Sequence, residues 1–235
     1  MKIDLQITKF YFLTCNNEKR KYHMFEEFSN YNITAVTPIT NIEKTKSGIS
    51  GFSRILDLAI KNQDPTKPFQ PFIIFEDDVK KYRDFPKEIE IPDNADILYL
   101  GLSSFGMSEN SHTPHVFYDN IDENTIRIYN MLSLHGTAIC SIRGLLAIQK
   151  CMMESYFTNN IWDMYTAWIQ PFYNVYALRK PLVYQWSELG GQEGATKIEI
   201  MEPSNPNIPD YWINKNLASI LTCNPECNAE YPSSK

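Results

Sequence analysis

Residues 69–79 read Phe-Gln-Pro-Phe-Ile-Ile-Phe-Glu-Asp-Asp-Val, and this stretch decides the fold class. Its four apolar residues, 72–75, predict a strand that is buried on both faces. Three acids, Glu76, Asp77 and Asp78, follow without a break. Carboxylates beside a buried strand are costly unless a cation neutralises them. The stretch therefore predicts either a metal site at the end of a central strand or an acidic, solvated turn.

The segments around this strand alternate between strand-like and helix-like patterns, and the β-α-β opening indicates a parallel sheet. Further strands are predicted at residues 9–14, 33–36, 96–101, 126–131, 137–142, 174–178 and 182–184. Helices are predicted from residue 18, over 48–62, after residue 144 and from residue 162. The first of these should bury Tyr22, Phe25 and Phe28 on one face.

We expect a single α/β domain over residues 1–205, with a mixed, mostly parallel central sheet and flanking helices. Residues 206–235 carry little periodicity and are expected to form a weakly structured tail. Hydrophobic residues make up 43% of the 235-residue chain, which is enough for a sizeable core.

Charge and cysteine usage exclude several classes of function. The 22 basic and 28 acidic side chains give a net charge of −6, which argues against a nucleic-acid partner. No stretch approaches about 18 consecutive apolar residues, so no membrane span is expected. The five cysteines are scattered and odd in number, which favours a reducing compartment, and we expect a cytoplasmic location.

The order of the acids gives a first expectation for their roles. If the strand continues past Phe75, alternate side chains point to opposite faces, so Glu76 and Asp78 share one face and Asp77 the other. One acid would then reach a sugar hydroxyl, while the acid two residues later binds a metal ion. Hard divalent ions such as Mg²⁺ and Mn²⁺ take carboxylate oxygens as ligands.

Thr14 and Arg20 flank the loop after the first predicted strand. In open α/β sheets, ligands bind at the carboxyl ends of the strands, which is where this loop would lie. The start of the following helix supplies backbone donors for an anion, and Arg20 could add a charged fork. The alternative is an exposed arginine in the first turn of a helix.

Two further side chains have both a structural and a functional interpretation. His135 precedes a predicted strand and is either a metal or phosphate contact or a structural histidine. Asp163 lies at the start of an amphipathic helix, where a carboxylate is favourable for electrostatic reasons alone. It is also placed to act as a general base toward an acceptor hydroxyl.

Taken in order, these motifs resemble those of glycosyltransferase family 25 and its relatives of GT-A fold, which include bacterial lipopolysaccharide sugar transferases and domains of large DNA viruses. The resemblance covers roughly residues 10–185. It is carried by Phe-Leu-Thr-Cys-Asn-Asn-Glu-Lys-Arg (12–20), Phe-Glu-Asp-Asp-Val (75–79), Asp-Ile-Leu-Tyr-Leu-Gly (96–101), Gly-Thr-Ala-Ile-Cys-Ser-Ile-Arg-Gly (136–144), Trp-Asp (162–163) and Pro-Leu-Val-Tyr-Gln (181–185). Ser-Gly-Ile-Ser-Gly-Phe-Ser-Arg (47–54) is similar to a further family segment, but Phe52 stands where the family usually has a histidine.

The resemblance implies a metal-dependent glycosyltransferase with a Rossmann-like nucleotide half. The donor would be a nucleotide sugar, usually UDP-linked, the cofactor Mn²⁺ or Mg²⁺, and the acceptor a hydroxyl of a glycan. Transfer would invert the anomeric centre if an aspartate acts directly as the base. The resemblance implies that the nucleotide is bound by Thr14, Arg20, Glu76 and Asp77. It implies Asp78 and His135 as metal ligands and Asp163 as the catalytic base.

Two other functions use the same residues. A metal-dependent phosphohydrolase or glycosidase would need the same carboxylates, because a glycosidase requires a paired acid and base around the scissile bond. A non-catalytic module that binds a nucleotide sugar or a glycan would need the pocket but no turnover. The sequence alone leaves both alternatives open.

Overall fold

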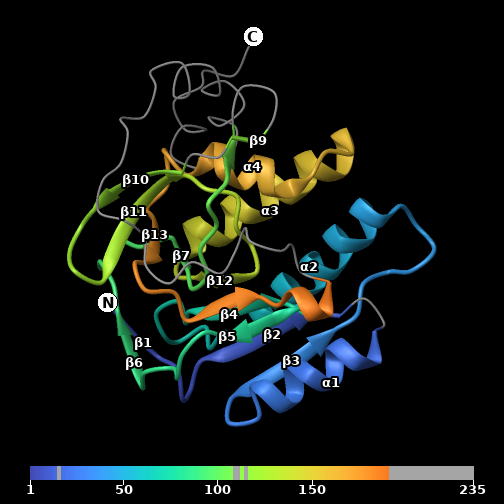
Figure 1. Cartoon of the computed structure of the whole chain (residues 1–235), viewed down its shortest axis with the longest axis horizontal. Helices are drawn as coiled ribbons and strands as arrows, with labels where there is room; N and C mark the ends of the chain where they lie inside the picture. Colours follow the sequence, from blue (N-terminus) through green and yellow to red (C-terminus); the bar gives the residue numbers. More distant parts are fainter. Residues whose placement is uncertain (15–16, 108–111, 114–115, 191–235) are drawn as a thin grey trace.

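The computed structural model describes residues 1–14, 17–107, 112–113 and 116–190. Within these residues, helices cover both faces of an eight-stranded mixed sheet (Figure 1). The predicted mixed α/β architecture is confirmed. The predicted boundary at residue 205 and the tail over 206–235 lie outside the described residues. In the described part, no helix is both long and apolar enough to cross a membrane.

The central sheet is less parallel than predicted. Three of its seven described pairings are parallel, and four are antiparallel. The prediction was wrong because a fully apolar strand shows burial on both faces but not the direction of its neighbours. In sheet order the strands are β10 (Phe117–Asn120), β11 (Thr125–Asn130), β13 (Val175–Leu178), β7 (Ile97–Tyr99), β12 (Gly136–Ile139), β4 (Phe72–Glu76), β2 (Lys9–Leu13) and β3 (Asn32–Val36).

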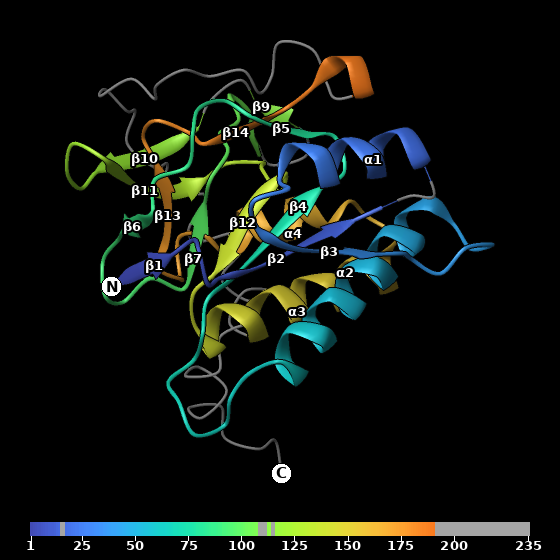
Figure 2. The ribbon, with the colours of Figure 1, turned by 90° about the horizontal axis from the view of Figure 1, so that it is seen from below.

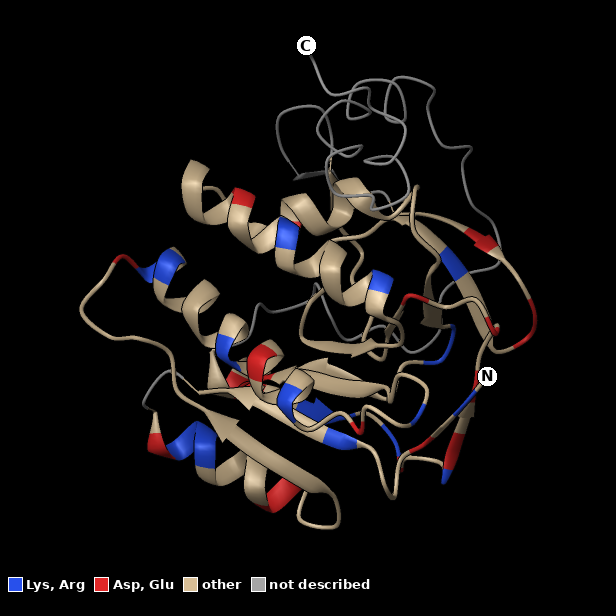
Figure 3. Ribbon diagram, turned by 180° about the vertical axis from the view of Figure 1, so that it is seen from behind, with Lys and Arg blue, Asp and Glu red and all other residues tan. Residues whose placement is uncertain are grey.

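Four α-helices are described, and they lie on two sides of the sheet (Figure 2). α2 and α3 lie on one side, and α1 lies on the other. Acidic and basic residues are interspersed along the described chain (Figure 3). The helices are α1 (Glu18–Glu27), α2 (Lys44–Lys61), α3 (Ile142–Thr158) and α4 (Trp162–Ile169), and a short 3₁₀ turn, η1, covers Ser187–Leu189.

Alternating side chains of β2 supply both cores. Phe10 and Phe12 point toward α1, whereas Tyr11 and Leu13 point toward α2 and α3. Phe10 and Phe12 are fully buried, and burying such a ring contributes about 1.5–3 kcal/mol. The continuous apolar run of this strand is therefore explained by helices on both faces.

The first helix begins where the sequence predicts, but it buries a different face. Asn17 caps it, because its side-chain oxygen accepts a hydrogen bond from the backbone N–H of Arg20 at 3.2 Å. Phe28 is fully buried as predicted, whereas Tyr22 is 68% exposed and Phe25 41% exposed. Met24, four residues before Phe28, contacts the sheet instead, since residues i and i+4 lie on one helix face.

Several short elements escaped the sequence analysis. Segments of two or three residues have too few apolar positions to show a period. The strand predicted over 137–142 ends at Ile139, because Ser141 caps α3 by accepting from the Gly144 N–H at 2.9 Å. The short strands pair as β1 (Lys2–Asp4) with β6 (Glu88–Glu90), β5 (Val79–Lys81) with β14 (Val183–Gln185), and β8 (Gly106–Met107) with β9 (His112–Thr113).

Candidate functional site

The carboxyl ends of β2 and β4 lie side by side. The two strands are parallel neighbours, and Leu13 is the register partner of Glu76. The two chain segments that follow these strands therefore leave the sheet at the same end. One segment carries Thr14, and the other carries Asp77 and Asp78. We call the group Glu76, Asp77 and Asp78 the acidic edge.

Arg20 lies in the first turn of α1 and contacts the acidic edge. Its Nη1 donates to Asp77 Oδ1 at 2.6 Å, and its Nη2 is 3.7 Å from Asp78 Oδ2. Its Nε donates to the Leu189 carbonyl at 2.7 Å, and Nη2 also donates to that carbonyl. The Arg20 guanidinium is directed at carboxylates and at the turn after β14, and its contact with a bound phosphate stays a prediction.

The predicted alternation of the three acids is wrong. β4 ends at Glu76, and Asp77 and Asp78 form a turn before β5. Arg20 contacts both Asp77 and Asp78, so these side chains do not lie on opposite faces. The alternation rule holds only while the backbone stays extended, which it does not past Glu76.

Glu76 is held in an environment that disfavours its charge. Burial raises its pKa well above the usual range, and the charges of Asp78 and Asp163 raise it further. Gln185 Nε2 donates to Glu76 Oε2 at 2.7 Å, which opposes that rise. A buried carboxyl with a raised pKa holds its proton more readily than an ordinary surface glutamate does.

Asp78 combines burial with an unmatched oxygen. Its side chain is 9% exposed, and its Oδ1 has no hydrogen-bond partner among the residues that the structure describes. Burial raises its pKa, while Arg20 opposes that shift. Such an oxygen is costly to bury without a donor or a cation, so it marks a place for a ligand.

Thr14 presents a second unmatched polar group at the same edge. Its backbone N–H donates to the Val36 carbonyl at 3.0 Å, which fixes the loop entry. Its hydroxyl is buried and finds no partner within the described residues. A hydroxyl both donates and accepts, so it suits a ligand oxygen.

His135 is joined to the acidic edge through its backbone and not through its ring. Its carbonyl accepts from the Glu76 N–H at 3.3 Å. The ring is 2% exposed, and Nδ1 lies 3.3 Å from Ser133 Oγ. Burial lowers the pKa of His135 to about 4, so the ring is neutral at pH 7.

The ring of His135 packs on Gly101. A Cβ at Gly101 would lie 2.0 Å from His135 Nε2, so only glycine permits this approach. Nε2 has no partner among the described residues. The ring of His135 therefore packs beside the end of β7. Within the described residues, the ring makes no contact with Asp78.

Asp163 lies in the first turn of α4 and is half-buried. The N-cap residue, Ile161, makes no side-chain hydrogen bond, and Asp163 is the acidic residue of the first turn, where its charge favours the helix N-terminus. Its charge raises the pKa of both Glu76 and Tyr99. The fold thus brings Asp163 within electrostatic reach of the acidic edge, although 86 residues separate it from Asp77 in the sequence.

Two groups at this site carry no assigned role in the sequence analysis. Gln185 lies in the Pro-Leu-Val-Tyr-Gln segment, and that segment was the available signal for it. The Leu189 carbonyl binds Arg20, but a backbone group gives no sequence signal at all. Gln185 ends β14 and Leu189 follows it, and the pairing of β14 with β5 brings both to the acids.

Metal-binding side chains do not gather into a full coordination shell. Within the described residues, no group of three or more His, Cys, Asp or Glu side chains could hold a metal ion. Any ion at Asp78 would therefore complete its shell with oxygens from a ligand and water.

No family model matches this chain, and no curated protein matches it. The resemblance to glycosyltransferase family 25 thus rests on the quoted segments, and the function is inferred from the residues themselves.

Proposed function

We propose that this chain is a metal-dependent glycosyltransferase of GT-A-like fold, which moves a sugar from a UDP-linked donor to a hydroxyl of a glycan. The observation that carries the proposal is the buried Oδ1 of Asp78, which has no hydrogen-bond partner among the described residues. An acidic edge with one unmatched oxygen, at the carboxyl end of a central strand, is suited to a cation that accompanies a diphosphate.

The residues present fit a divalent ion such as Mn²⁺ or Mg²⁺. Asp78 would hold it, with Asp77 as the adjacent carboxylate, and no closed protein cage is needed because such ions keep phosphate and water ligands. When bound, the ion offsets the negative charge that develops on the leaving diphosphate. His135 is a weaker metal ligand in this proposal, since its ring packs on Gly101.

The nucleotide would lie over the carboxyl ends of β2 and β4. The first backbone N–H groups of α1 and the hydroxyl of Thr14 are donors for phosphate or ribose oxygens. Arg20 already contacts the acidic edge and would form ion pairs with both the acids and the phosphates. Glu76, oriented by Gln185, would accept a hydrogen bond from a ribose or sugar hydroxyl.

Asp163 is the proposed base. It would take the proton of the acceptor hydroxyl while that oxygen forms a bond to C1 of the sugar. The bond from C1 to the phosphate oxygen breaks, and its electron pair leaves with UDP. A single displacement of this kind inverts the anomeric centre.

A glycosidase is the second candidate, and the raised pKa of Glu76 favours it. Glycoside hydrolysis uses one carboxyl with a raised pKa as the general acid and a second carboxylate as base or nucleophile. In that case Glu76 would protonate the leaving oxygen, and Asp163 would activate water or attack C1. The two functions differ in whether an acceptor sugar is required.

A cytoplasmic location is part of the proposal. Cys140 and Cys151 are buried free thiols in the described part of the chain. Buried free thiols are compatible with a reducing compartment, where disulfides are rare.

UDP release from a panel of UDP-sugars tests the function. We expect release to require both Mn²⁺ and an acceptor glycan, and Asp78→Asn to lower kcat/KM by about 100-fold or more. Asp57→Asn, on the exposed side of α2, is the matched control and should keep full activity. Equal release without acceptor would support hydrolysis, and unchanged turnover in Asp78→Asn would exclude the proposed metal site.

A further inference from the structure

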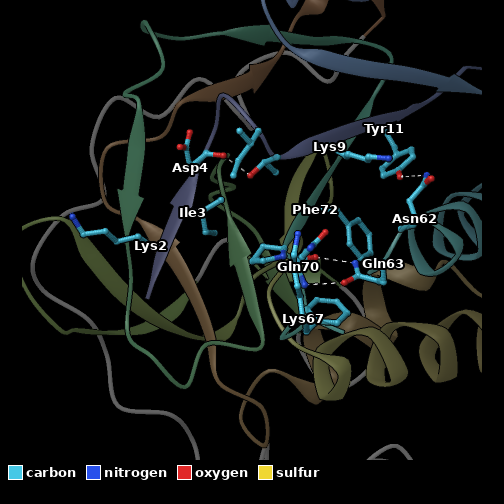
Figure 4. A pocket seen from close by; sticks show the side chains of 15 residues that line it. Lys2, Ile3, Asp4, Lys9, Tyr11, Asn62, Gln63, Lys67, Gln70 and Phe72 are labelled. Atoms are coloured by element: carbon cyan, nitrogen blue, oxygen red, sulfur yellow. Dashed lines mark hydrogen bonds between the residues drawn. The ribbon is translucent and has the colours of Figure 1, made fainter. Parts of the chain in front are cut away.

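A cavity of about 480 Å³ opens at the edge of the sheet opposite the acids (Figure 4). It lies at the amino ends of β2 and β4, where Lys9 is the register partner of Phe72. Leu13 and Glu76 end the same strands four residues later, about 13 Å away. The cavity is therefore separate from the proposed catalytic site. Its volume falls within the range of about 300–1,000 Å³ that is usual for small-molecule sites.

Three aromatic side chains, Tyr11, Phe69 and Phe72, are among the residues that line the cavity. Tyr11 and Phe72 meet edge to face, with ring centroids 6.0 Å apart, and Phe69 lies 6.2 Å from Phe72. At the rim, Ile7 is 78% exposed although it is apolar. Tyr11 and Phe72 are each 2% exposed and support the wall from behind, whereas Ile7 and the half-buried Phe69 offer apolar surface on which a ligand body would be shielded from water.

Polar contacts hold the cavity open. Asn62 Nδ2 donates to the Tyr11 hydroxyl at 3.0 Å, which joins the end of α2 to β2. Gln63 Nε2 donates to the Gln70 carbonyl at 2.9 Å, and the Gln70 N–H donates to Gln63 Oε1 at 2.8 Å. Both bonds use the backbone of Gln70, so its side-chain amide is left for a ligand. The walls are thus fixed before any ligand binds.

Three lysines and one aspartate line the cavity, and two of the lysines are already paired. Lys2 lies 3.2 Å from Glu88, and Lys67 lies 3.3 Å from Asp64. These surface pairs keep their charges satisfied without a ligand.

Lys9 is different, because no hydrogen bond or ion pair joins its ammonium group to any described residue. It shares a face of β2 with Tyr11, two residues on, and Figure 4 shows both on the same side of the cavity as Asn62. Asp4 lies on the β1 side and accepts a hydrogen bond from the Gln6 N–H at 2.9 Å. Lys9 therefore places a positive charge beside Tyr11, on the side of the cavity away from the Asp4 carboxylate.

We propose that this cavity binds a small amphipathic anion, with its aromatic or aliphatic body on Ile7 and Phe69 and its carboxylate, phosphate or sulfonate group at Lys9. Lys9 as a residue is partly buried, and an ammonium group beside a low-dielectric wall attracts an anion more strongly than one in bulk water, because screening is weaker there. The side-chain amide of Gln70 would add a hydrogen bond to a polar group on the same ligand.

Two naphthalene probes separate the charge from the apolar body. Fluorescence titration compares 1-anilinonaphthalene-8-sulfonate with N-phenyl-1-naphthylamine, which has the same rings and no charge. We expect the sulfonate to bind about tenfold more tightly, which corresponds to about 1.4 kcal/mol. Lys9→Gln should abolish that preference, whereas Lys87→Gln, an exposed lysine outside the cavity, should keep it. Loss of the preference in both variants, or in neither, overturns the proposal.

A second set of variants locates the bound probe. Gln70→Trp fills the cavity without removing the two backbone hydrogen bonds, and should weaken both probes at least tenfold. Ile7→Asp, at an exposed position that tolerates substitution, should weaken the sulfonate more than the neutral probe. The control is Phe157→Ser, because Phe157 is 77% exposed beside a separate apolar groove of about 360 Å³ between α2 and α3. If Phe157→Ser weakens the sulfonate and the two cavity variants do not, the probe binds at that groove and the proposal is wrong.

Discussion

Replacing Arg20 with Met tests whether the acidic edge depends on this one internal cation. Met retains much of the apolar stem of Arg but removes the guanidinium. Asp77, whose side chain is 4% exposed, then loses its donor at 2.6 Å. The Leu189 carbonyl loses the Arg20 Nε–H that lies 2.7 Å from it. The variant therefore removes the ion pairs with Asp77 and Asp78 and the link between α1 and the turn after β14.

The expected cost follows from the burial of the pair. Removing one partner of a buried ion pair typically costs about 3–5 kcal/mol, because the remaining charge is left in a low dielectric. The Arg20 side chain is 21% exposed, so water replaces part of its interaction with the acids. We expect the free energy of unfolding of Arg20→Met to be lower by about 2–4 kcal/mol at pH 7.

The charges also fix how the loss depends on pH. Burial raises the pKa of Asp78, and Arg20 opposes that rise, so removing Arg20 raises this pKa further. A carboxyl whose pKa is higher in the folded than in the unfolded protein loses stability as pH rises through the folded value. The deficit of Arg20→Met relative to the unchanged protein should therefore be smallest in acid and grow toward pH 7.

Urea denaturation between pH 5 and 8, followed by tryptophan fluorescence, measures both effects. Lys21→Met is the matched control, because Lys21 forms only an exposed pair with Glu18 at 3.6 Å. Its cost should stay at or below about 0.5 kcal/mol at every pH. The reasoning is refuted if Arg20→Met costs no more than Lys21→Met, or if its deficit is the same at pH 5 and pH 8.

Three further predictions follow from the geometry. Asp163→Asn should lower kcat about 10²–10⁴-fold while UDP binding, measured by thermal shift, is retained; equal losses in both would contradict its role as a base. Glu76→Gln should be more stable than the unchanged protein at pH 7, because burial raises the pKa of Glu76. This gain in the free energy of unfolding, measured by urea titration, should disappear when the pH falls below 4.5, the ordinary pKa of a glutamate. A gain that is constant with pH would argue against this. Gly144→Ala should destabilise the fold by about 1–3 kcal/mol, since its Cβ would lie 2.3 Å from the Asp96 carbonyl oxygen. Gly48→Ala should stabilise the fold by about 0.5–1 kcal/mol, because a Cβ there meets nothing within 4 Å. Melting temperatures of the two variants that shift in the same direction would contradict this.

Local patterns in the sequence were sufficient to predict most of the elements. The apolar runs of β2 and β4 and the period of α2 are visible in short windows, because burial dictates which side chains are apolar. Asn17 was recognisable as a cap type, because its short side chain accepts from the helix N-terminus. The direction of β12 was not predictable, since no local pattern records which strand becomes a neighbour.

The sequence by itself determined that three acids follow a buried strand and that an arginine stands early in the first helix. Only the tertiary structure decided that Arg20 would contact these acids, that Asp163 would come within reach of Glu76, and that Gln185 would bind it. The physical reason is that strand pairing and turn geometry bring distant segments together, and the sequence of one segment does not show which other segment it will contact.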